Sequence, residues 1–399
     1  MSSDESALVV GVPKEADPRE RRVAIVPATV SQMRKSGLSV LVERGAGLAA
    51  GFPDSDYEAK GATFADSRRN LFNTADVIAQ VRALGACGTC GEEDVSSLRI
   101  GQVLVASCDP LTFPEQVKVA AEKGVTAFAL ELVPRITRAQ SMDILSSMAT
   151  VAGYRAVLLA ATAAPRMFPM MMTAAGTLKP ARVLVIGAGV AGLQAIATAR
   201  RLGAVVYGYD IRPVVREQVE SLGGKFVELD VKAEAAETKG GYAKEMDEDF
   251  YRRQREAMKK VIADMDVVIT TAAIPGKKAP VLVTAEMVQA MAPGSVVVDL
   301  AAERGGNVEV TRPGETIDYN GVKVLGPENV PADVPVHASE MYSRNLWTFL
   351  QQIVKGGKLS IDTEDEIVRD TLLTREKEVV NARVRELLKM EPLTAAASA

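Results

Sequence analysis

The chain has 399 residues, of which 47% are hydrophobic and 25% are charged, and its formal net charge is −4. This composition is ordinary for a folded, water-soluble protein, and the length permits two or three domains with separate cores. The acidic balance offers no basic surface, which excludes nucleic acid as a partner. The first residues lack a signal sequence, and no stretch has about 18 continuous apolar residues, so we expect a cytoplasmic chain without membrane insertion.

Short apolar runs alternate with helical stretches along the first third of the chain. The predicted strands are residues 8–12, 38–42, 76–81, 103–107 and 126–130. This alternation predicts an α/β domain with a parallel sheet and helices on both faces. The charged loop after the first strand, residues 13–27, either faces a ligand cleft at the carboxyl ends of the strands or forms a salt-bridged surface.

Metal-binding and redox residues are rare, with one histidine and three cysteines in the chain. One histidine excludes a histidine-based metal site, and we expect no metal. Cys87 and Cys90 have the spacing of a redox motif. However, they lie in a glycine-rich stretch without the strand-to-helix setting of such motifs, so we interpret them as loop cysteines.

A polar segment, residues 134–147, precedes an apolar stripe of helical spacing that continues to Pro165. The stripe predicts a long helix that links two domains. Thr137 and Gln140 have capping-box spacing, so the pattern alone allows Gln140 either a structural or a functional role. A methionine-rich stretch, residues 167–172, then forms an adaptable apolar surface, either packed beneath the second domain or used at a subunit interface.

A glycine-rich turn follows the buried strand predicted at residues 183–186. Gly187 permits the tight turn, Gly189 allows a pyrophosphate to approach the backbone, and Gly192 allows the next helix to pack against the sheet. A second strand, residues 205–209, ends at Asp210, where an acid that binds the adenosine ribose 2′-hydroxyl is expected. The pattern predicts a Rossmann dinucleotide site, with a methyl-transfer fold as the alternative.

Asp210 favours NAD over NADP because a carboxylate repels a 2′-phosphate, although the nearby Arg212 weakens this inference. Further strands are predicted at residues 225–230, 266–272, 295–299 and 322–325. We expect the cofactor to contact the first helical turn and the ends of these strands. The candidate residues are Gly187, Gly189, Val190, Ala191, Gly192, Asp210, Ile211, Arg212, Thr271 and Ala272.

The polar loop at residues 231–246 is long for a compact domain and contains Gly240 and Gly241. Its length and composition suit a lid whose tip, Tyr242 and Met246, covers a planar ring, with a plain surface loop as the alternative. A helix is predicted to start near Asp247, and another to span residues 339–354. The tail contains a possible strand at 367–373 and a short helix at 381–388.

Three segments together resemble a known family: residues 134–147, 240–246 and 274–282. From about Val10 to Thr374 the chain is similar to the NAD(H)-binding domain of proton-translocating transhydrogenases, within the family that also contains alanine dehydrogenase. The resemblance implies an α/β fold of two Rossmann-like, doubly wound parallel-sheet domains separated by a cleft. We assign residues 1–140 and 330–399 to the first domain and 141–329 to the second.

The resemblance also implies the roles of specific residues and partners. Arg135, Gln140, Asp143 and Ser146 match the segment that orients the nicotinamide and its ribose, and Tyr242 and Met246 match a mobile closing loop. NAD(H) is the expected cofactor of this chain, and NADP the cofactor of a partner. The family implies a homodimer in complex with an NADP(H)-binding domain and a membrane subunit, which would place the chain at the inner membrane through its partners.

The sequence departs from the alanine dehydrogenase branch at residues needed for amino-acid oxidation. The histidine and lysine of that branch appear here as Ser107 and Arg82, and only Arg22 is kept. Amino-acid oxidation needs a general base, whereas hydride transfer between two nicotinamides moves no proton at the reacting carbons. We therefore expect direct hydride transfer from NADH to NADP⁺ on a partner. The alternatives are an amino-acid dehydrogenase and a cofactor-sensing regulatory subunit.

Overall fold

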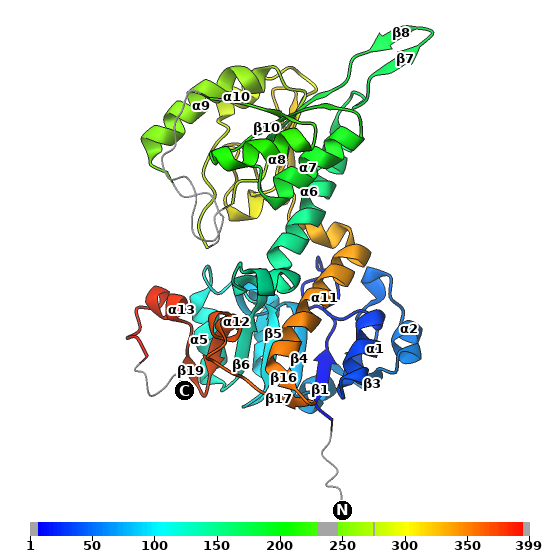
Figure 1. Ribbon diagram of the computed structural model, residues 1–399, viewed down its shortest axis with the longest axis vertical. Coiled ribbons are helices and arrows are strands. Elements are labelled where there is room, and N and C mark those ends of the chain that lie inside the picture. Colours follow the sequence, from blue (N-terminus) through cyan, green and yellow to red (C-terminus); the bar gives the residue numbers. More distant parts are fainter. Residues whose placement is uncertain (1–6, 230–245, 274–275, 394–399) are drawn as a thin grey trace, which may run out of the picture. The chain divides into compact units, whose positions relative to one another are not determined.

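The computed structural model describes residues 7–229, 246–273 and 276–393 (Figure 1). The chain forms two compact units, one of Met1–Met148 with Ala332–Ala399 and the other of Ala149–Pro331. The expected boundaries were at residues 140/141 and 329/330. Helix α6 (Ile144–Ala163) contains the first boundary, because it begins in the first unit and continues into the second.

The first unit is built on an eight-stranded sheet with the order β19-β18-β6-β5-β4-β1-β2-β3. Six of these strands are parallel: β1 (Val9–Val12), β2 (Ser39–Glu43), β3 (Thr63–Ala65), β4 (Val77–Arg82), β5 (Val103–Ser107) and β6 (Thr126–Ala129). The antiparallel strands β18 (Leu372–Arg375) and β19 (Glu378–Val379) extend the sheet beside β6. All five predicted strands of this unit are confirmed.

Helices cover both faces of this sheet because its strands are apolar on both sides. Val103 and Val105 of β5 belong to one core cluster, whereas Leu104 and Ala106 belong to the other. The helices are α1 (Pro27–Lys35), α2 (Asp54–Ala59), α3 (Arg68–Thr74), α4 (Gly91–Ser97), α5 (Pro114–Glu122), α11 (Pro335–Ile353), α12 (Glu366–Thr371) and α13 (Ala382–Leu387). A short hairpin of two-residue strands, β16 (Val354–Lys355) and β17 (Lys358–Leu359), follows α11.

The prediction of a strand at residues 367–373 is wrong for most of that range, because helix α12 extends to Thr371 and β18 begins only at Leu372. The Asp365 side chain caps this helix by accepting a hydrogen bond from the Ile367 amide (2.8 Å). Ile367, Val368 and Thr371 are buried at helical spacing. The predicted helix at 381–388 is confirmed as α13, with Asn381 as its N-cap.

The second unit contains a seven-stranded sheet with the order β11-β10-β9-β12-β13-β15-β14. The strands are β9 (Arg182–Ile186), β10 (Val205–Tyr209), β11 (Lys225–Phe226), β12 (Val267–Thr270), β13 (Val296–Asp299), β14 (Thr316–Tyr319) and β15 (Val322–Leu325), and only β14 is antiparallel to its neighbour. The helices are α7 (Val190–Arg201), α8 (Arg216–Ser221), α9 (Glu248–Ala263) and α10 (Ala285–Gln289). After β9 the chain adds β10 on one side and β12 on the other, which creates a topological switch point, the position at which open α/β sheets generally bind ligands.

A two-stranded hairpin, β7 (Met171–Thr173) and β8 (Gly176–Leu178), projects from the rest of the second unit (Figure 1). All six strand residues are exposed. Within residues 167–172, Phe168 is buried in the core of the second unit, whereas the four methionines are exposed and do not pack beneath it, which was one of the two expected arrangements. Met172 is 81% exposed, and the use of this surface at a subunit interface stays a prediction.

Helix α6 is the one helix in the described part of the chain that is long and apolar enough to cross a membrane by length and composition. Core helices of folded domains meet the same criteria. Ala156, Val157 and Ala160 of α6 are fully buried in the core of the second unit. These contacts favour a core helix, and its bounds confirm the long helix predicted up to Pro165.

Candidate dinucleotide site

The glycine-rich turn between β9 and α7 is closely packed at two of its three glycines. Gly187 has a φ of +95°, and a Cβ there would lie 2.7 Å from the Thr271 hydroxyl oxygen. A Cβ at Gly192 would lie 1.8 Å from the Gly187 carbonyl oxygen. Both positions therefore require glycine so that the chain can turn and α7 can approach the sheet.

Gly189 differs because it has ordinary extended backbone and open space beside it. Its φ is −76°, and the nearest atom to a Cβ at this position would be Nη2 of Arg212, 4.0 Å away. Gly189 is also the N-cap of α7, and no described side chain caps this helix. The first turn, with Val190 and Ala191, thus offers backbone N–H groups to an anion such as a pyrophosphate. The space at Gly189 lets that anion reach them.

Asp210 lies directly after β10 and is 9% exposed. Its Oδ2 accepts a hydrogen bond from the Ala188 amide in the glycine-rich turn (2.8 Å), and its Oδ1 accepts one from the Arg212 amide (2.9 Å). The Arg212 guanidinium donates to both carboxylate oxygens, from Nε to Oδ1 and from Nη2 to Oδ2, each at 2.9 Å. The Asp210 carboxylate is therefore fixed beside the glycine-rich turn. Ile211, which lies between Asp210 and Arg212 in the sequence, packs against the apolar core of the second unit.

The end of β12 forms the other side of the turn. The Thr271 hydroxyl donates to the Gly187 carbonyl oxygen (2.9 Å), and the Ala272 amide donates to Oδ1 of Asn307 (3.0 Å). Nδ2 of the fully buried Asn307 donates in return to the Ala272 carbonyl (2.9 Å). We did not predict Asn307 from the sequence. The two glycines before it, both with positive φ, were the signal for a tight turn at this position.

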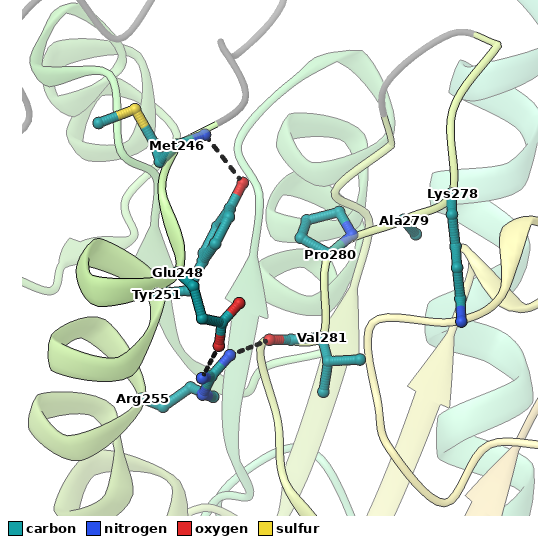
Figure 2. A pocket seen from close by; sticks show the side chains of 8 residues that line it. All are labelled: Met246, Glu248, Tyr251, Arg255, Lys278, Ala279, Pro280 and Val281. Atoms are coloured by element: carbon teal, nitrogen blue, oxygen red, sulfur yellow. Dashed lines mark hydrogen bonds and ion pairs between the residues drawn. The ribbon is translucent and has the colours of Figure 1, made fainter.

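The predicted closing loop lies mostly outside the described residues, and Tyr242 is among those not described. Met246 is described, and its amide donates to the Tyr251 hydroxyl (3.4 Å) at the start of α9. Both line a cavity of about 520 Å³. Figure 2 shows its other lining residues, the Glu248–Arg255 ion pair and residues 278–281. The Asp247 side chain caps α9 by accepting from the Phe250 amide (2.7 Å), which confirms the predicted helix start.

The candidate segment of the first unit contains a short 3₁₀ helix, η4 (Thr137–Met142), before α6. This helix has no side-chain cap, so the capping box suggested by Thr137 and Gln140 is not formed. Arg135 and Gln140 are exposed. The segment is fixed in place because Nδ2 of Asn345 on α11 donates to the Ser141 carbonyl oxygen (2.8 Å).

Asp143 and Ser146 have a structural role at the start of α6. Oδ1 of Asp143 accepts from the Ser146 amide (2.9 Å), and Oδ2 accepts from the Ser146 hydroxyl (2.6 Å). This arrangement caps the helix and holds both side chains in a defined orientation. The structure thus pairs two of the four candidates in this segment with each other and leaves Arg135 and Gln140 exposed.

The charged loop after β1 forms ion pairs that are largely buried. Arg22 donates to both carboxylate oxygens of Glu20, with Nη2 and Oε2 2.7 Å apart, and the two side chains are 7% and 0% exposed.

The same loop also contacts the end of β4, where Asp17 pairs with Arg82 (3.7 Å). Glu15 accepts from the amides of Val81 and Arg82, and burial raises its pKa to about 8. The loop thus forms ion pairs as one alternative expected, but they are largely buried and not on the surface, and the ligand-cleft alternative stays a prediction.

Comparison with known proteins identifies the family of the chain. Residues 11–152 match the family model described as "Alanine dehydrogenase/PNT, N-terminal domain", and residues 156–382 match "Alanine dehydrogenase/PNT, C-terminal domain". The chain belongs to the alanine dehydrogenase/PNT family. The predicted resemblance and the α/β fold class are confirmed.

Relatives in the alanine dehydrogenase/PNT family differ in their similarity to this chain. A protein of Rhodospirillum rubrum, named as a portion of NAD(P) transhydrogenase subunit alpha, is 49% identical over 93% of this chain and 97% of its own length. The crystal structure of transhydrogenase from Sinorhizobium meliloti shares 44% identity and a TM-score of 0.81, covering 94% of this chain and 99% of that one. Alanine dehydrogenase from Bacillus subtilis is 29% identical over 92% of this chain and 91% of its own length. The chain is thus more similar to these transhydrogenases than to that dehydrogenase.

Proposed function

We propose that this chain is the NAD(H)-binding subunit of a proton-translocating transhydrogenase, and that it positions NADH for direct hydride transfer to NADP⁺ held by a partner subunit. The observation that carries the proposal is the uncapped first turn of α7 beside the fixed Asp210 carboxylate. The first binds a pyrophosphate and the second a ribose hydroxyl. The relatives named transhydrogenase supply the reaction class.

The residues of this chain bind and orient the cofactor, which supplies the hydride when it is bound. Val190 and Ala191 present amides to the pyrophosphate, Thr271 holds the turn from the side of β12, and Ala272 is held by Asn307. Arg135 and Gln140 contact the nicotinamide end in this proposal, while Asp143 and Ser146 keep their segment in place. Correct placement of reacting groups alone contributes several kcal/mol to catalysis.

The charges of the first unit fit a reaction without proton transfer to a substrate. Arg22, the residue shared with the alanine dehydrogenase branch, is held in a buried pair with Glu20. A buried cation already paired in this way is a poor ligand for a second carboxylate, because the new contact has to displace the first. His337, the single histidine, is exposed on α11. These observations support the transhydrogenase over the amino-acid dehydrogenase.

The proposal includes partners. We propose a homodimer in which the β7–β8 hairpin of one copy contacts the other, because its strand residues, including Met171, Met172 and Leu178, are exposed among the described residues. The subunit then associates with an NADP(H)-binding domain and a membrane subunit, and lies on the cytoplasmic side of the inner membrane through them. The name "subunit alpha" of the relatives supports a multi-subunit complex.

The test is a calorimetric titration of the purified chain with NADH, NAD⁺ and NADPH. We expect NADH and NAD⁺ to bind and NADPH to bind at least about tenfold more weakly, because the 2′-phosphate meets the Asp210 carboxylate. Equal affinities for NADH and NADPH would contradict the assigned role of Asp210, and absence of binding by all three would overturn the proposed function.

A further inference from the structure

We propose that Arg212 is a specificity-determining residue whose 2′-phosphate affinity is suppressed by Asp210. In the wild-type chain, the Asp210 carboxylate forms a bidentate ion pair with the Arg212 guanidinium. When the charge of Asp210 is removed, Arg212 becomes a ligand for a 2′-phosphate, and the site accepts NADP(H). The inference rests on the proposed function, because it assumes that the adenosine ribose lies at Asp210.

The geometry of the pair places the guanidinium at the edge of the dinucleotide site. The two side chains are 12% and 5% exposed for Arg212 and Asp210, so the pair is largely shielded from water. Nη2 of Arg212 is also the nearest atom to the open space at Gly189, 4.0 Å from the position of a Cβ. Arg212 therefore lies between the start of α7 and the end of β10, at the ribose end of the proposed site.

The charges predict that the wild-type site disfavours a 2′-phosphate although an arginine is present. A bidentate guanidinium–carboxylate pair satisfies the donors that a phosphate would use, and its net charge is zero. A 2′-phosphate would also face the carboxylate directly. Removing one member of a shielded pair leaves the other charge uncompensated, and an uncompensated arginine attracts a dianion strongly.

The backbone contacts of Asp210 indicate which substitution tests the idea without disturbing the turn. Asp210 accepts hydrogen bonds from the amides of Ala188 and Arg212. Asp210→Asn keeps the shape of the side chain and one acceptor oxygen while removing the charge. Asp210→Ser keeps a smaller acceptor and serves as a second variant in case the asparagine amide repels a backbone donor.

The experiment measures dissociation constants for NADH and NADPH by calorimetry on the full chain. The proteins are wild type, Asp210→Asn, Asp210→Ser and Asp210→Asn/Arg212→Ala. A matched control is Asp210→Asn/Arg216→Ala, which removes an exposed arginine of the same unit that pairs with Glu220 and Glu228. The control has the same net charge as the test variant but keeps Arg212.

We expect either single variant to bind NADPH at least about tenfold more tightly than wild type and NADH more weakly, since charge-assisted contacts to phosphate are gained and one to the ribose is lost. The gain should disappear in the Arg212→Ala double variant and persist in the Arg216→Ala control. The gain should also shrink with added salt.

Two results would overturn the inference while leaving the proposed function intact. In the first, wild type binds NADH but neither single variant gains affinity for NADPH. In the second, the gain in NADPH affinity survives the loss of Arg212. If wild type binds neither nucleotide, the proposed function fails, and the inference fails with it.

Discussion

The three glycines of the turn after β9 illustrate how residues of one motif divide between folding and binding. Gly187 and Gly192 have no room for a Cβ, whereas Gly189 has open space and an allowed backbone conformation. The motif spacing predicted all three from the sequence. Which glycines are needed for packing, and which one leaves open space, became visible only from the atoms around each one.

This division predicts opposite outcomes for two alanine variants. Gly192→Ala should destabilise the second unit by more than about 2 kcal/mol, because the Gly187 carbonyl oxygen would lie 1.8 Å from the new methyl group. Gly189→Ala should melt like wild type but bind NADH at least about tenfold more weakly, because the methyl group occupies the path of the pyrophosphate. Thermal melting and calorimetry on both proteins check this, and normal NADH binding by Gly189→Ala would count against the proposed pyrophosphate position.

Gln140 is exposed and forms no capping box, so its predicted role is in positioning the nicotinamide ribose. Gln140→Asn shortens the side chain by one methylene. We expect an unchanged melting temperature and a hydride-transfer rate reduced by roughly 10–100-fold in the complex with the NADP-binding partner, because small misplacement of reacting atoms is costly. Single-turnover transfer measures the rate. A lower melting temperature with normal transfer would indicate a structural role instead.

Glu131 is a buried acid that the sequence did not single out. Its Oε1 accepts hydrogen bonds from the amides of Cys108 (2.7 Å) and Asp109 (2.5 Å). Its Oε2 is buried without a hydrogen-bond partner among the described residues. Burial raises the pKa of this carboxyl from 4.5 to about 7, which means that ionisation is unfavourable in the folded protein.

The raised pKa predicts a loss of stability with rising pH. Because the folded state holds this proton more tightly than the unfolded state, the contribution of Glu131 is present below about pH 4.5 and is lost as pH rises through about 7. Glu131→Gln keeps the Oε1 contacts and removes the charge. Relative to the variant, wild type should lose about 3 kcal/mol of unfolding free energy between pH 4.5 and 8.

Denaturant unfolding of both proteins across this pH range measures that difference. Glu15, whose pKa is also raised, keeps its own pH dependence in both proteins, so the difference isolates Glu131. Parallel curves for wild type and variant would show that Glu131 ionises freely in the folded protein.

At the scale of secondary-structure elements, the sequence predicted the buried parallel strands well, because runs such as residues 183–186 are β-branched and apolar on both faces. It failed at the C-terminal tail, where α12 and β18 adjoin within residues 366–375. Both elements are short, and the partner of β18 is β6, more than 200 residues earlier in the chain. A local pattern does not contain that pairing.

The β7–β8 hairpin predicts the oligomeric state. Met172 and Leu178 are 81% and 48% exposed, so replacing both with serine should leave the folding of one copy unchanged within about 0.5 kcal/mol. If the hairpin contacts a second copy, the double variant should raise the dimer dissociation constant at least about tenfold. Sedimentation velocity over a concentration series measures it. The exposed Leu48, 66% accessible in the first unit, gives a matched control as Leu48→Ser. An unaffected dimer in the hairpin variant would remove the hairpin from the interface.

At the scale of the whole molecule, the residues with proposed functional roles are distributed over the two α/β units. The glycine-rich turn and Asp210 belong to the second unit, whereas Arg135, Gln140 and the Asp143–Ser146 pair belong to the first. The sequence predicted these residues through the motif spacing and the family resemblance. It did not predict Asn307, because the contact of Asn307 with Ala272 joins segments that are 35 residues apart in the chain.

The central claim is that this chain presents NADH to a separate NADP-binding partner and performs no redox reaction alone. The measurement uses NADH carrying deuterium at the transferred position, the purified chain, NADP⁺ and a purified NADP-binding domain, with NADPH analysed by mass spectrometry. We predict that NADPH forms only when the partner is present and retains the deuterium, because the hydride passes directly between the two rings. Oxidation of NADH by the chain alone with pyruvate and ammonia, at an enzymatic rate, would contradict this claim and favour the amino-acid dehydrogenase.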